Sequence, residues 1–388
     1  MKNLFIALIL ICISNIINAQ WQWTGGPPGG AISCIATKDS NIYASPSSGL
    51  YRSVDNGNNW FTTNLPLNVN TKAIICNDSN IFVGSLNHGI YKSTNYGISW
   101  TQINNGLTDT MVTSLAVSGT TIFAGTYSNG IFLSTNNGAN WIPSNNGISN
   151  PYIKSLAVHD SVIYAGTSWW DGGVFYSTNN GTNWTLINIG LPAEDIRAIA
   201  IIGTNVFAGY VNRGVYLSIN NSPNWVQVNN GLSADTSIGC FHVNGSYLFA
   251  GTGLGVYLTT DNGNNWLPFN TGYINSVEAL ASNDTYVFAA TGGNGVWRRP
   301  LKDIVGVKET SKNINFTVYP NPATNTLNIE SSTKFSQLLI SDVLGNVVIR
   351  QQIYNHAVSV DVSGLGKGIY FVKLVSENGF VVRRFLKE

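Results

Sequence analysis

The most constraining feature of this 388-residue sequence is a short motif that returns about every forty residues. Its first copy reads Ser-Val-Asp-Asn-Gly-Asn-Asn-Trp over residues 53–60, and every copy ends in a tryptophan. These residues are Trp60, Trp100, Trp141, Trp184, Trp225 and Trp266, spaced 40, 41, 43, 41 and 41 residues apart. A fixed period of this length is typical of stacked or radial repeat architectures.

Each repeat divides into four short strands separated by turns of Gly, Asn, Asp and Ser. In the first repeat, these strands span residues 32–37, 41–45, 49–53 and 60–63. Four strands at this period predict one blade of a β-propeller. A Gly-apolar-aromatic triplet precedes each motif, and a seventh triplet at residues 295–297 has no motif after it. We therefore predict an all-β fold, with a seven-bladed β-propeller over residues 20–300.

The seventh blade lacks an outermost strand of its own. The segment Trp-Gln-Trp-Thr at residues 21–24 resembles the strands that follow each motif, such as Trp-Thr-Gln at residues 100–102. We expect this N-terminal strand to complete the seventh blade, because a closed ring leaves no open strand edge to pair with other chains.

The first 19 residues have the pattern of a secretory signal peptide, with Lys2, an apolar run over residues 4–11 and a plausible cleavage site at Ala19. The apolar run is too short to cross a bilayer and no later stretch approaches that length, so we expect no membrane span. A net charge of +1 gives no field that favours nucleic acid as a partner.

The repeated motif resembles the Asp-box (BNR) repeat of sialidase-like propellers, through six matches to Ser/Thr-x-Asp/Asn-x-Gly-x-x-Trp. Four copies carry Asn where that family prefers Asp, and the fifth has Ser222 in place of Gly. An Asp or Asn side chain can accept hydrogen bonds from backbone N–H groups inside the turn, and Gly tolerates positive φ. We therefore expect the motifs to be structural, with each Trp packed between adjacent blades.

A different pattern follows the repeats. Residues 301–314 are polar and predict a linker, and residues 315–388 contain about seven short strands that predict a small Ig-like β-sandwich. The order Tyr-Pro-Asn-Pro at 319–322, Leu-x-x-Gly-x-Tyr at 365–370 and a basic final strand is similar to the type A sorting domain of type IX secretion. This resemblance implies contact with that secretion machinery and a location outside the cell or on the outer-membrane surface of a Gram-negative bacterium. A generic adhesive sandwich is the alternative.

One candidate site is a ring of charges near the central channel. The second residue of each predicted innermost strand is charged in four repeats, at Lys72, Lys154, Arg197 and Glu278. Three cations at equivalent positions, in a chain with only 10% charged residues, suggest a site for an anion. The alternative is a set of solvated charges at strand starts.

A second candidate is the longer loop of the fourth repeat, which contains Trp169, Trp170 and Asp171. Two adjacent tryptophans in a loop do not both face inward easily, so one is expected to offer a stacking platform for a sugar ring or an apolar partner. Packing against a neighbouring blade is the alternative. Tyr210 and Arg213 occupy the equivalent loop of the next repeat and are expected to extend the same surface.

These features favour a binding module over an enzyme. Sialidase-like catalysis requires an arginine cluster and an Arg-Ile-Pro signature that the repeats lack. The runner-up is a secreted glycoside hydrolase, for which the candidate carboxylates are Asp109, Glu194, Asp195, Asp235 and Glu278. The repeat and blade number also resemble those of the photosystem II assembly factor family, which implies a protein-binding scaffold. We expect a monomer that binds an extracellular glycan or protein, without catalytic residues, metal or cofactor.

Overall fold

The computed structural model describes residues 20–77, 80–169, 172–233, 236–272, 276–303, 316–331, 334–342, 347–353, 355–376 and 379–388. The predicted signal peptide and most of the predicted linker lie outside these residues. The chain divides into two compact units, one ending at Leu301 and the other beginning at Lys302. Each unit is described by itself.

The described residues of the first unit form seven four-stranded antiparallel sheets. The first sheet contains β2 (Ile32–Lys38), β3 (Asn41–Pro46), β4 (Tyr51–Ser53) and β5 (Phe61–Thr62), and the second contains β6 (Thr71–Cys76), β7 (Ile81–Ser85), β8 (Ile90–Ser93) and β9 (Thr101–Gln102). The third contains β10 (Val112–Ser118), β11 (Thr121–Thr126), β12 (Ile131–Ser134) and β13 (Ile142–Pro143), and the fourth contains β14 (Ile153–His159), β15 (Val162–Thr167), β16 (Val174–Ser177) and β17 (Thr185–Leu186). The fifth contains β18 (Ile196–Ile202), β19 (Asn205–Tyr210), β20 (Gly214–Ser218) and β21 (Val226–Gln227), and the sixth contains β22 (Ile238–Asn244), β23 (Tyr247–Thr252), β24 (Gly255–Thr259) and β25 (Leu267–Pro268). The seventh contains β26 (Val277–Ser282), β27 (Tyr286–Thr291), β28 (Val296–Pro300) and β1 (Gln22–Trp23).

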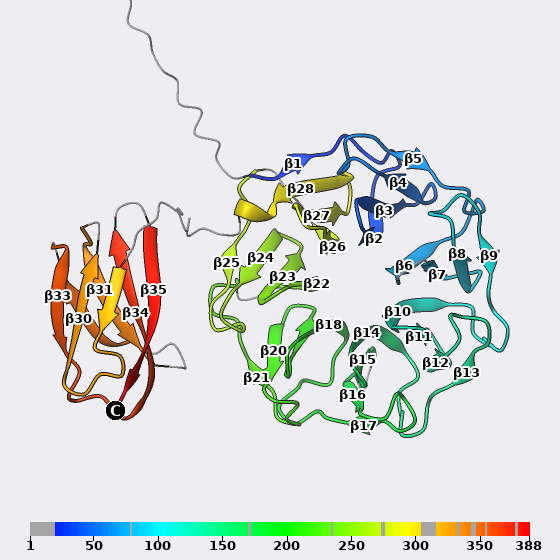
Figure 1. Cartoon of the computed structure of the whole chain (residues 1–388). Helices are drawn as coiled ribbons and strands as arrows, with labels where there is room; N and C mark the ends of the chain where they lie inside the picture. The colour runs from blue at the N-terminus through cyan, green and yellow to red at the C-terminus, as the bar shows by residue number, and fades with distance from the viewer. Residues whose placement is uncertain are drawn as a thin grey trace, which may run out of the picture. The chain divides into compact units, whose positions relative to one another are not determined.

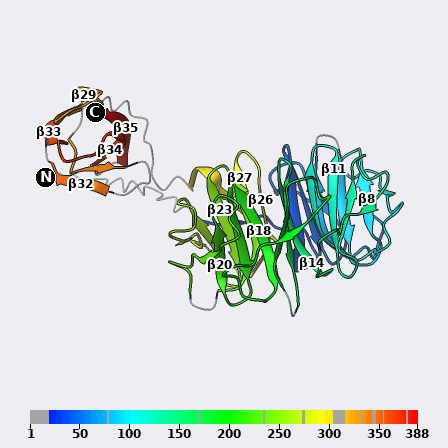
Figure 2. The same cartoon turned by 90° about the horizontal axis from the view of Figure 1, so that it is seen from below.

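The sheets are arranged radially around a central axis, as in a β-propeller (Figure 1). The first strand of each sheet is innermost and packs against the first strand of the next, and β26 packs against β2. Figure 2 shows the ring edge-on, with strands such as β18, β20 and β26 running between its two faces. The loops that carry variable residues therefore gather on these faces.

The ring is closed by the N-terminal strand, as the sequence predicts. Strand β1 pairs with β28, with Gln22 opposite Arg298 and Trp23 opposite Trp297. The indole nitrogen of Trp21 donates to the carbonyl of Phe269 at 2.6 Å, as that of Trp266 donates to the corresponding carbonyl between the fifth and sixth sheets. Trp21 thus makes between the sixth and seventh sheets the bond that Trp141, Trp225 and Trp266 make between other neighbouring sheets.

The repeated motif forms a hydrogen-bonded turn between the third and fourth strands. In the first copy, the hydroxyl oxygen of Ser53 accepts from the backbone N–H of Gly57 at 2.8 Å, and a carboxylate oxygen of Asp55 accepts from the backbone N–H of Asn59 at 2.9 Å. Asn side chains accept the same bond in the second, third and fourth copies. The structural role expected of the Asp or Asn is confirmed, because either side chain supplies the acceptor that the turn requires.

The fifth copy has a different turn. Its Asn220 side chain accepts from the hydroxyl of Thr204, and the backbone N–H of Asn224 donates instead to the hydroxyl of Ser222 at 3.1 Å. Ser222, which replaces the motif glycine, therefore supplies the acceptor that Asn220 does not.

The motif tryptophans pack between neighbouring sheets, as predicted. Trp141 is buried in one apolar cluster with Phe82 and Ile90 of the second sheet and Phe132 of the third. Its indole N–H donates to the carbonyl of Ile103 at 2.7 Å. Each of these tryptophans therefore joins two sheets through apolar contacts.

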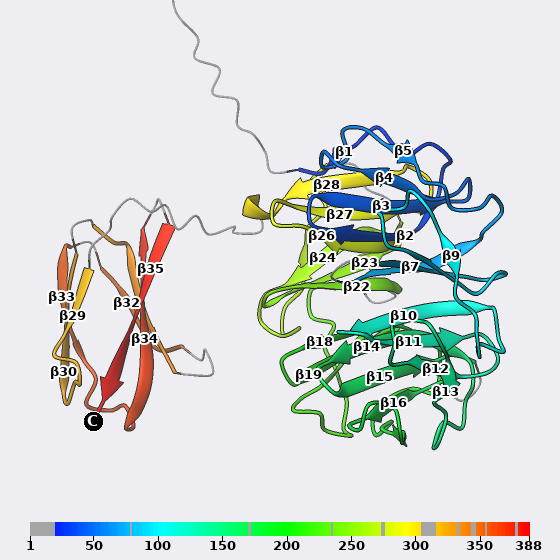
Figure 3. The ribbon, with the colours of Figure 1, turned by 45° about the vertical axis from the view of Figure 1, so that its right-hand side comes forward.

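The described residues of the second unit form two antiparallel sheets. Its strands are β29 (Phe316–Tyr319), β30 (Thr326–Ser331), β31 (Gln337–Ser341), β32 (Val347–Gln352), β33 (Ala357–Asp361), β34 (Gly368–Ser376) and β35 (Gly379–Lys387). One sheet has the order β29-β30-β33 and the other β32-β31-β34-β35, and they face each other in Figure 3. Their core includes Phe316, Leu327, Leu338, Val372 and Phe385.

We predict that Trp141→Ala destabilises the first unit by about 3–5 kcal/mol, because it leaves a cavity between two sheets and an unpaired carbonyl at Ile103. Chemical denaturation of the chain from residue 20 measures this loss. Ile142→Ala is the control, since Ile142 is the next residue but is exposed. Equal denaturation midpoints for the two variants would contradict the packing role of Trp141.

Candidate functional site

The seven innermost strands share a β-bulge near their starts. In each of them the register shifts between the first and third residues, which makes the second residue the bulged one. A bulge re-aims its side chain without ending the strand pairing. At two of these positions, the hydroxyls of Ser33 and Thr113 donate to the first residue of the next innermost strand, at the carbonyls of Thr71 and Ile153. Bulged side chains therefore lie where neighbouring inner strands meet.

Three of the bulged residues are the predicted cations. Lys72 and Arg197 are exposed, while Lys154 is half-buried. The pKa of Lys154 is lowered, mainly by desolvation and further by the positive charges of Lys72 and Arg197. Lys154 therefore lies near both other cations, at one end of the ring. Glu278 has the equivalent position in the seventh sheet, where its carboxylate accepts from the hydroxyl of Ser276 at 3.0 Å.

An exposed row of aromatic side chains lies on the same face of the ring. This aromatic row consists of Tyr127, Tyr152 and Trp169, which are 40%, 37% and 49% exposed. The ring centroids of Tyr127 and Tyr152 are 5.7 Å apart, and those of Tyr152 and Trp169 are 6.1 Å apart. Tyr127 and Trp169 follow the second strands of the third and fourth sheets, and Tyr152 lies just before β14. In antiparallel sheets these positions all fall at one end of the strands.

Trp169 was predicted as a stacking residue, whereas Tyr127 and Tyr152 were not. Trp170 and Asp171, the other two predicted residues of this loop, lie outside the described residues. The sequence does contain an indication for Tyr152, because this residue lies next to the start of a predicted innermost strand. The predicted cations lie at the same place in their repeats, near the central channel. An aromatic residue at that place was a detectable candidate.

A charged cleft begins at the end of the aromatic row. It has a volume of 740 Å³ and is lined by Trp169, Ala193, Glu194, Asp195, Arg197, Val211, Asn212 and Arg213. The guanidinium of Arg213 donates from two nitrogens to the Glu194 carboxylate, with a shortest distance of 2.7 Å. The Arg213 guanidinium lowers the pKa of Glu194. A carboxylate oxygen of Asp195 accepts from the backbone N–H of Trp169 at 2.6 Å and so fixes the loop that carries this indole.

The structure therefore brings three predicted residues into one cleft: Trp169, Arg197 and Arg213. Lys154 is close enough for its pKa to respond to the charges of Arg197 and Asp195. Lys72 belongs to the cation group but does not line the cleft, and Glu278 belongs to the seventh sheet. The aromatic row and the charged cleft together form a continuous surface over the third, fourth and fifth sheets.

The prediction for Tyr210 was wrong. This residue is fully buried, with its ring 5.2 Å from that of Tyr216 and its hydroxyl 3.4 Å from the carbonyl of Pro192. Burial raises its pKa. Tyr210 is the last residue of β19 and is still paired in the sheet, opposite Ile196 and Gly214, so strand alternation turns its side chain into the apolar cluster between the fourth and fifth sheets.

Asp109, a candidate carboxylate for hydrolysis, has a structural role. It is buried, and it accepts from the backbone N–H groups of Met111, Ser128 and Asn129 and from the hydroxyl of Ser128. Burial alone would raise its pKa, but these hydrogen bonds outweigh that effect and lower it. Asp109 thus holds the loop that carries Tyr127.

Two of the candidate carboxylates, Asp109 and Glu194, lack the raised pKa that a general acid of a glycosidase has, since the pKa of each is lowered. Asp235, another candidate, lies outside the described residues. Among the residues that the structure describes, no group of three or more His, Cys, Asp or Glu side chains is placed to hold a metal ion.

Comparison with known families identifies the second unit. Residues 317–388 match the family described as the secretion system C-terminal sorting domain. This segment is therefore a sorting domain, which indicates secretion by the type IX system to the cell surface or the extracellular space. No curated protein matches the chain. In the part of the chain that the structure describes, no helix has the length and apolar character to span a membrane.

Solved structures share the fold of the chain at low sequence identity. PorZ, a bacterial surface component of the type IX secretion system of Porphyromonas gingivalis, has 14% identity and a TM-score of 0.55, with 94% of this chain and 60% of PorZ covered. YCF48 from Cyanidioschyzon merolae has 16% identity and a TM-score of 0.57, covering 73% and 98%, and YCF48 has also been solved bound to a D1 peptide. A GH74 xyloglucanase from Xanthomonas campestris has 14% identity and a TM-score of 0.59, covering 94% and 68%. These similarities establish the propeller fold alone.

We predict that acid weakens the first unit partly through Asp109. Its folded pKa lies below the unfolded value of about 3.9, so the carboxylate stabilises the fold above that pH and the contribution is lost as pH falls through the folded pKa. Urea denaturation between pH 7 and pH 3 should show a smaller loss of stability for Asp109→Asn than for the unchanged chain. Asp284→Asn, at an exposed position, is the control and should follow the unchanged chain. Equal pH dependence in all three proteins would contradict this role.

Proposed function

We propose that residues 20–300 form a seven-bladed propeller of the Asp-box type that acts outside the cell as a non-catalytic binding module. In this proposal, residues 301–314 link it to an Ig-like sorting domain over residues 315–388. The observation that carries the function is the aromatic row that leads into the charged cleft. Its ligand is an extracellular glycan or protein, bound by a monomer without metal or cofactor.

The aromatic row supports binding because its three exposed rings keep apolar surface in contact with water, which is unfavourable and which a bound ligand would relieve. Its side chains are pre-positioned: the rings contact one another, and Asp109 and Asp195 hold the two loops that carry Tyr127 and Trp169. Little conformational entropy remains to be lost when a ligand stacks on them. Sugar rings and apolar side chains both suit such a surface.

The charged cleft supports recognition of polar groups next to the stacked part of the ligand. Arg197 is exposed there, and Arg213 is already held by Glu194 in a two-pronged contact. Guanidinium groups bind carboxylates and hydroxyl oxygens with defined geometry. The peptide bound by YCF48 supports a protein ligand, and the xyloglucanase supports a glycan, since both proteins share this fold.

A glycoside hydrolase is the second candidate, because Glu194 and Asp195 line one cleft and the xyloglucanase shares the fold. Against it, Glu194 is paired with Arg213 and Asp195 accepts a backbone N–H. Each carboxylate thus already has a structural partner, whereas hydrolysis needs one of them as a proton donor.

We predict that Trp169→Ala and Arg197→Ala each weaken ligand binding about tenfold or more, because each removes a side chain that lines the cleft. A glycan array and a peptide array probed with the chain from residue 20 identify ligands, and calorimetry gives the affinities. Leu254→Ala is the matched control, since Leu254 is an exposed apolar residue in the corresponding loop of the sixth sheet. Unchanged affinity in both variants would refute the site, and cleavage of a bound glycan that Glu194→Gln abolishes would favour the hydrolase.

We predict that deletion of residues 315–388 keeps the first unit inside the cell envelope, because the sorting domain is the segment that directs export. Immunoblots of culture medium, cell surface and periplasm measure its location. A reporter protein that carries a signal peptide and residues 301–388 is the complementary test and should appear outside the cell. Equal export of the truncated and full-length chains would refute the assignment.

A further inference from the structure

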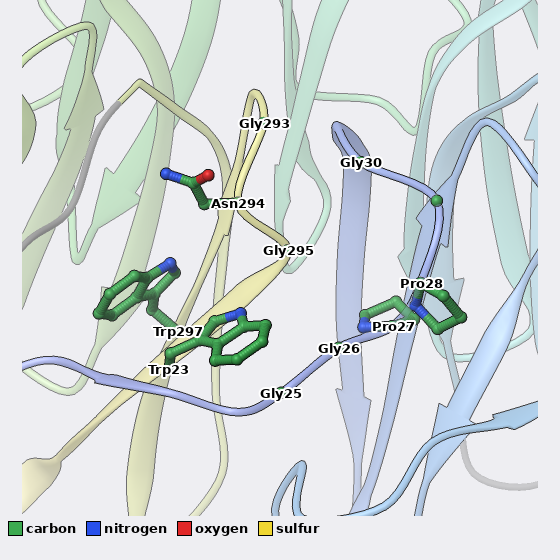
Figure 4. Close-up of a pocket in the computed structure, with 11 residues that line it drawn as sticks. Trp23, Gly25, Gly26, Pro27, Pro28, Gly30, Gly293, Asn294, Gly295 and Trp297 are labelled. Atoms are coloured by element: carbon green, nitrogen blue, oxygen red, sulfur yellow. The ribbon is translucent and has the colours of Figure 1, made fainter.

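A second pocket lies at the seam where the ring closes, on the seventh sheet. It has a volume of 520 Å³, within the range of roughly 300–1,000 Å³ that is usual for small-molecule sites. Trp23 and Trp297 form one part of its lining, and the rest comes from the loop of residues 25–30 and the turn of residues 293–295. Figure 4 shows the two indoles next to each other, the side chain of Asn294 near them, and Pro27 and Pro28 on the other side.

The two indoles face the pocket because of how the ring closes. Trp23 and Trp297 are direct partners across the β1–β28 pair. At the equivalent pair of the first sheet Tyr51 is opposite Thr62, and in the second sheet Tyr91 is opposite Gln102. Among the seven sheets of the described residues, only the strand supplied by the N-terminus brings a second aromatic ring to this position, in a pair formed by residues far apart in sequence.

Trp23 is 60% exposed, which leaves most of its ring open to the pocket and to solvent. An indole in this setting is a costly surface feature that structure alone does not require, since the smaller Thr, Gln, Pro and Leu occupy the same strand position elsewhere in the ring. This contrast points to a ligand that stacks on the ring.

The glycine-rich loop that forms the other side of the pocket is held in place. The carbonyl of Gly26 accepts from the backbone N–H of Val296 at 3.0 Å, and those of Pro28 and Gly29 accept from the hydroxyls of Ser48 and Ser47 at 3.3 and 3.4 Å. Gly29 has φ near +118°, and a Cβ there would lie 2.3 Å from the hydroxyl oxygen of Ser48. The pocket is therefore preformed, with its wall fastened to both the seventh and the first sheets.

The chemistry of the lining selects an uncharged ligand. None of its residues, all of which belong to the described part of the chain, has an ionisable side chain. It offers flat aromatic surface, glycine backbone and the amide of Asn294, which both donates and accepts. A ligand with a flat apolar face and a rim of hydroxyls matches this combination.

We propose that this seam pocket binds a neutral pyranose, stacked on Trp23 and hydrogen-bonded through its hydroxyls to Asn294. A charged sugar finds no counter-ion among the lining residues, in contrast to the cleft beside Arg197 and Arg213. The site goes beyond the proposed function, because it lies on other sheets and stands whatever ligand the aromatic row takes. A proline-rich peptide is the competing ligand for tryptophan-lined pockets and is an outcome of the test.

The test uses the chain from residue 20 and a panel of neutral oligosaccharides of glucose, galactose, mannose and xylose. Trp23→Thr installs the residue that the first sheet has at this position, so the variant keeps a strand that the ring already accommodates. We expect calorimetry and saturation-transfer NMR to detect at least one neutral sugar, with about tenfold weaker binding in Trp23→Thr and a smaller loss in Asn294→Ala. Phe61→Thr, which removes an exposed aromatic ring from β5, is the control and should bind normally.

Variants at one site distinguish its ligand binding from that of the other site. Trp169→Ala should leave binding of the neutral sugar unchanged, while Trp23→Thr should leave binding at the charged cleft unchanged. The seam proposal is overturned if no sugar of the panel binds, if Trp23→Thr binds as tightly as the unchanged chain while remaining folded by circular dichroism, or if only proline-rich peptides or charged sugars bind in a Trp23-dependent way. Each of these results leaves the proposal for the aromatic row standing.

Discussion

The fold depends on one pairing, that of β1 with β28, which joins the two ends of the ring. Every sheet has an apolar face that must be covered by the next sheet, and without closure one such face and one strand edge would meet water. The same N-terminal segment also ties the seventh sheet to the sixth, because the indole N–H of Trp21 donates to the carbonyl of Phe269, as that of Trp266 donates between the fifth and sixth sheets. The pairing joins residues that are far apart in the chain, and therefore costs loop-closure entropy that packing all around the ring offsets.

The two ends of the strands have different roles in each repeat. The motif turns use side-chain acceptors such as Asp55 and Asn95 to complete backbone hydrogen bonds, and even the divergent fifth copy supplies an acceptor from Ser222. The loops at the opposite ends of the strands do not contain this motif. There, carboxylates such as Asp109 and Asp195 hold loops that present Tyr127 and Trp169 to solvent.

Much of the architecture was predictable from the sequence because it rests on periodic features. The spacing of the tryptophans, the strand pattern and the N-terminal Trp-Gln-Trp-Thr segment define the sheets and their closure, and ordered motifs define the sorting domain. The candidate site was less accessible. Tyr210 and Tyr152 both lie at strand ends, yet one is buried and the other exposed, because the pairing of Tyr210 within its sheet decides its direction. The seam pocket joins segments from both ends of the ring, which no local pattern reveals.

The bulge at the start of every innermost strand has a consequence for how such a ring diversifies. Since the bulged residue lies outside the regular ladder, its side chain can change from Ser33 to Lys72 to Gly239 while the neighbouring hydrogen bonds keep their register. The mouth of the channel is thus ringed by seven equivalent positions, and the side chain at each can differ independently of the others. Duplicated repeats that are identical in their framework can in this way acquire different chemistry through single substitutions.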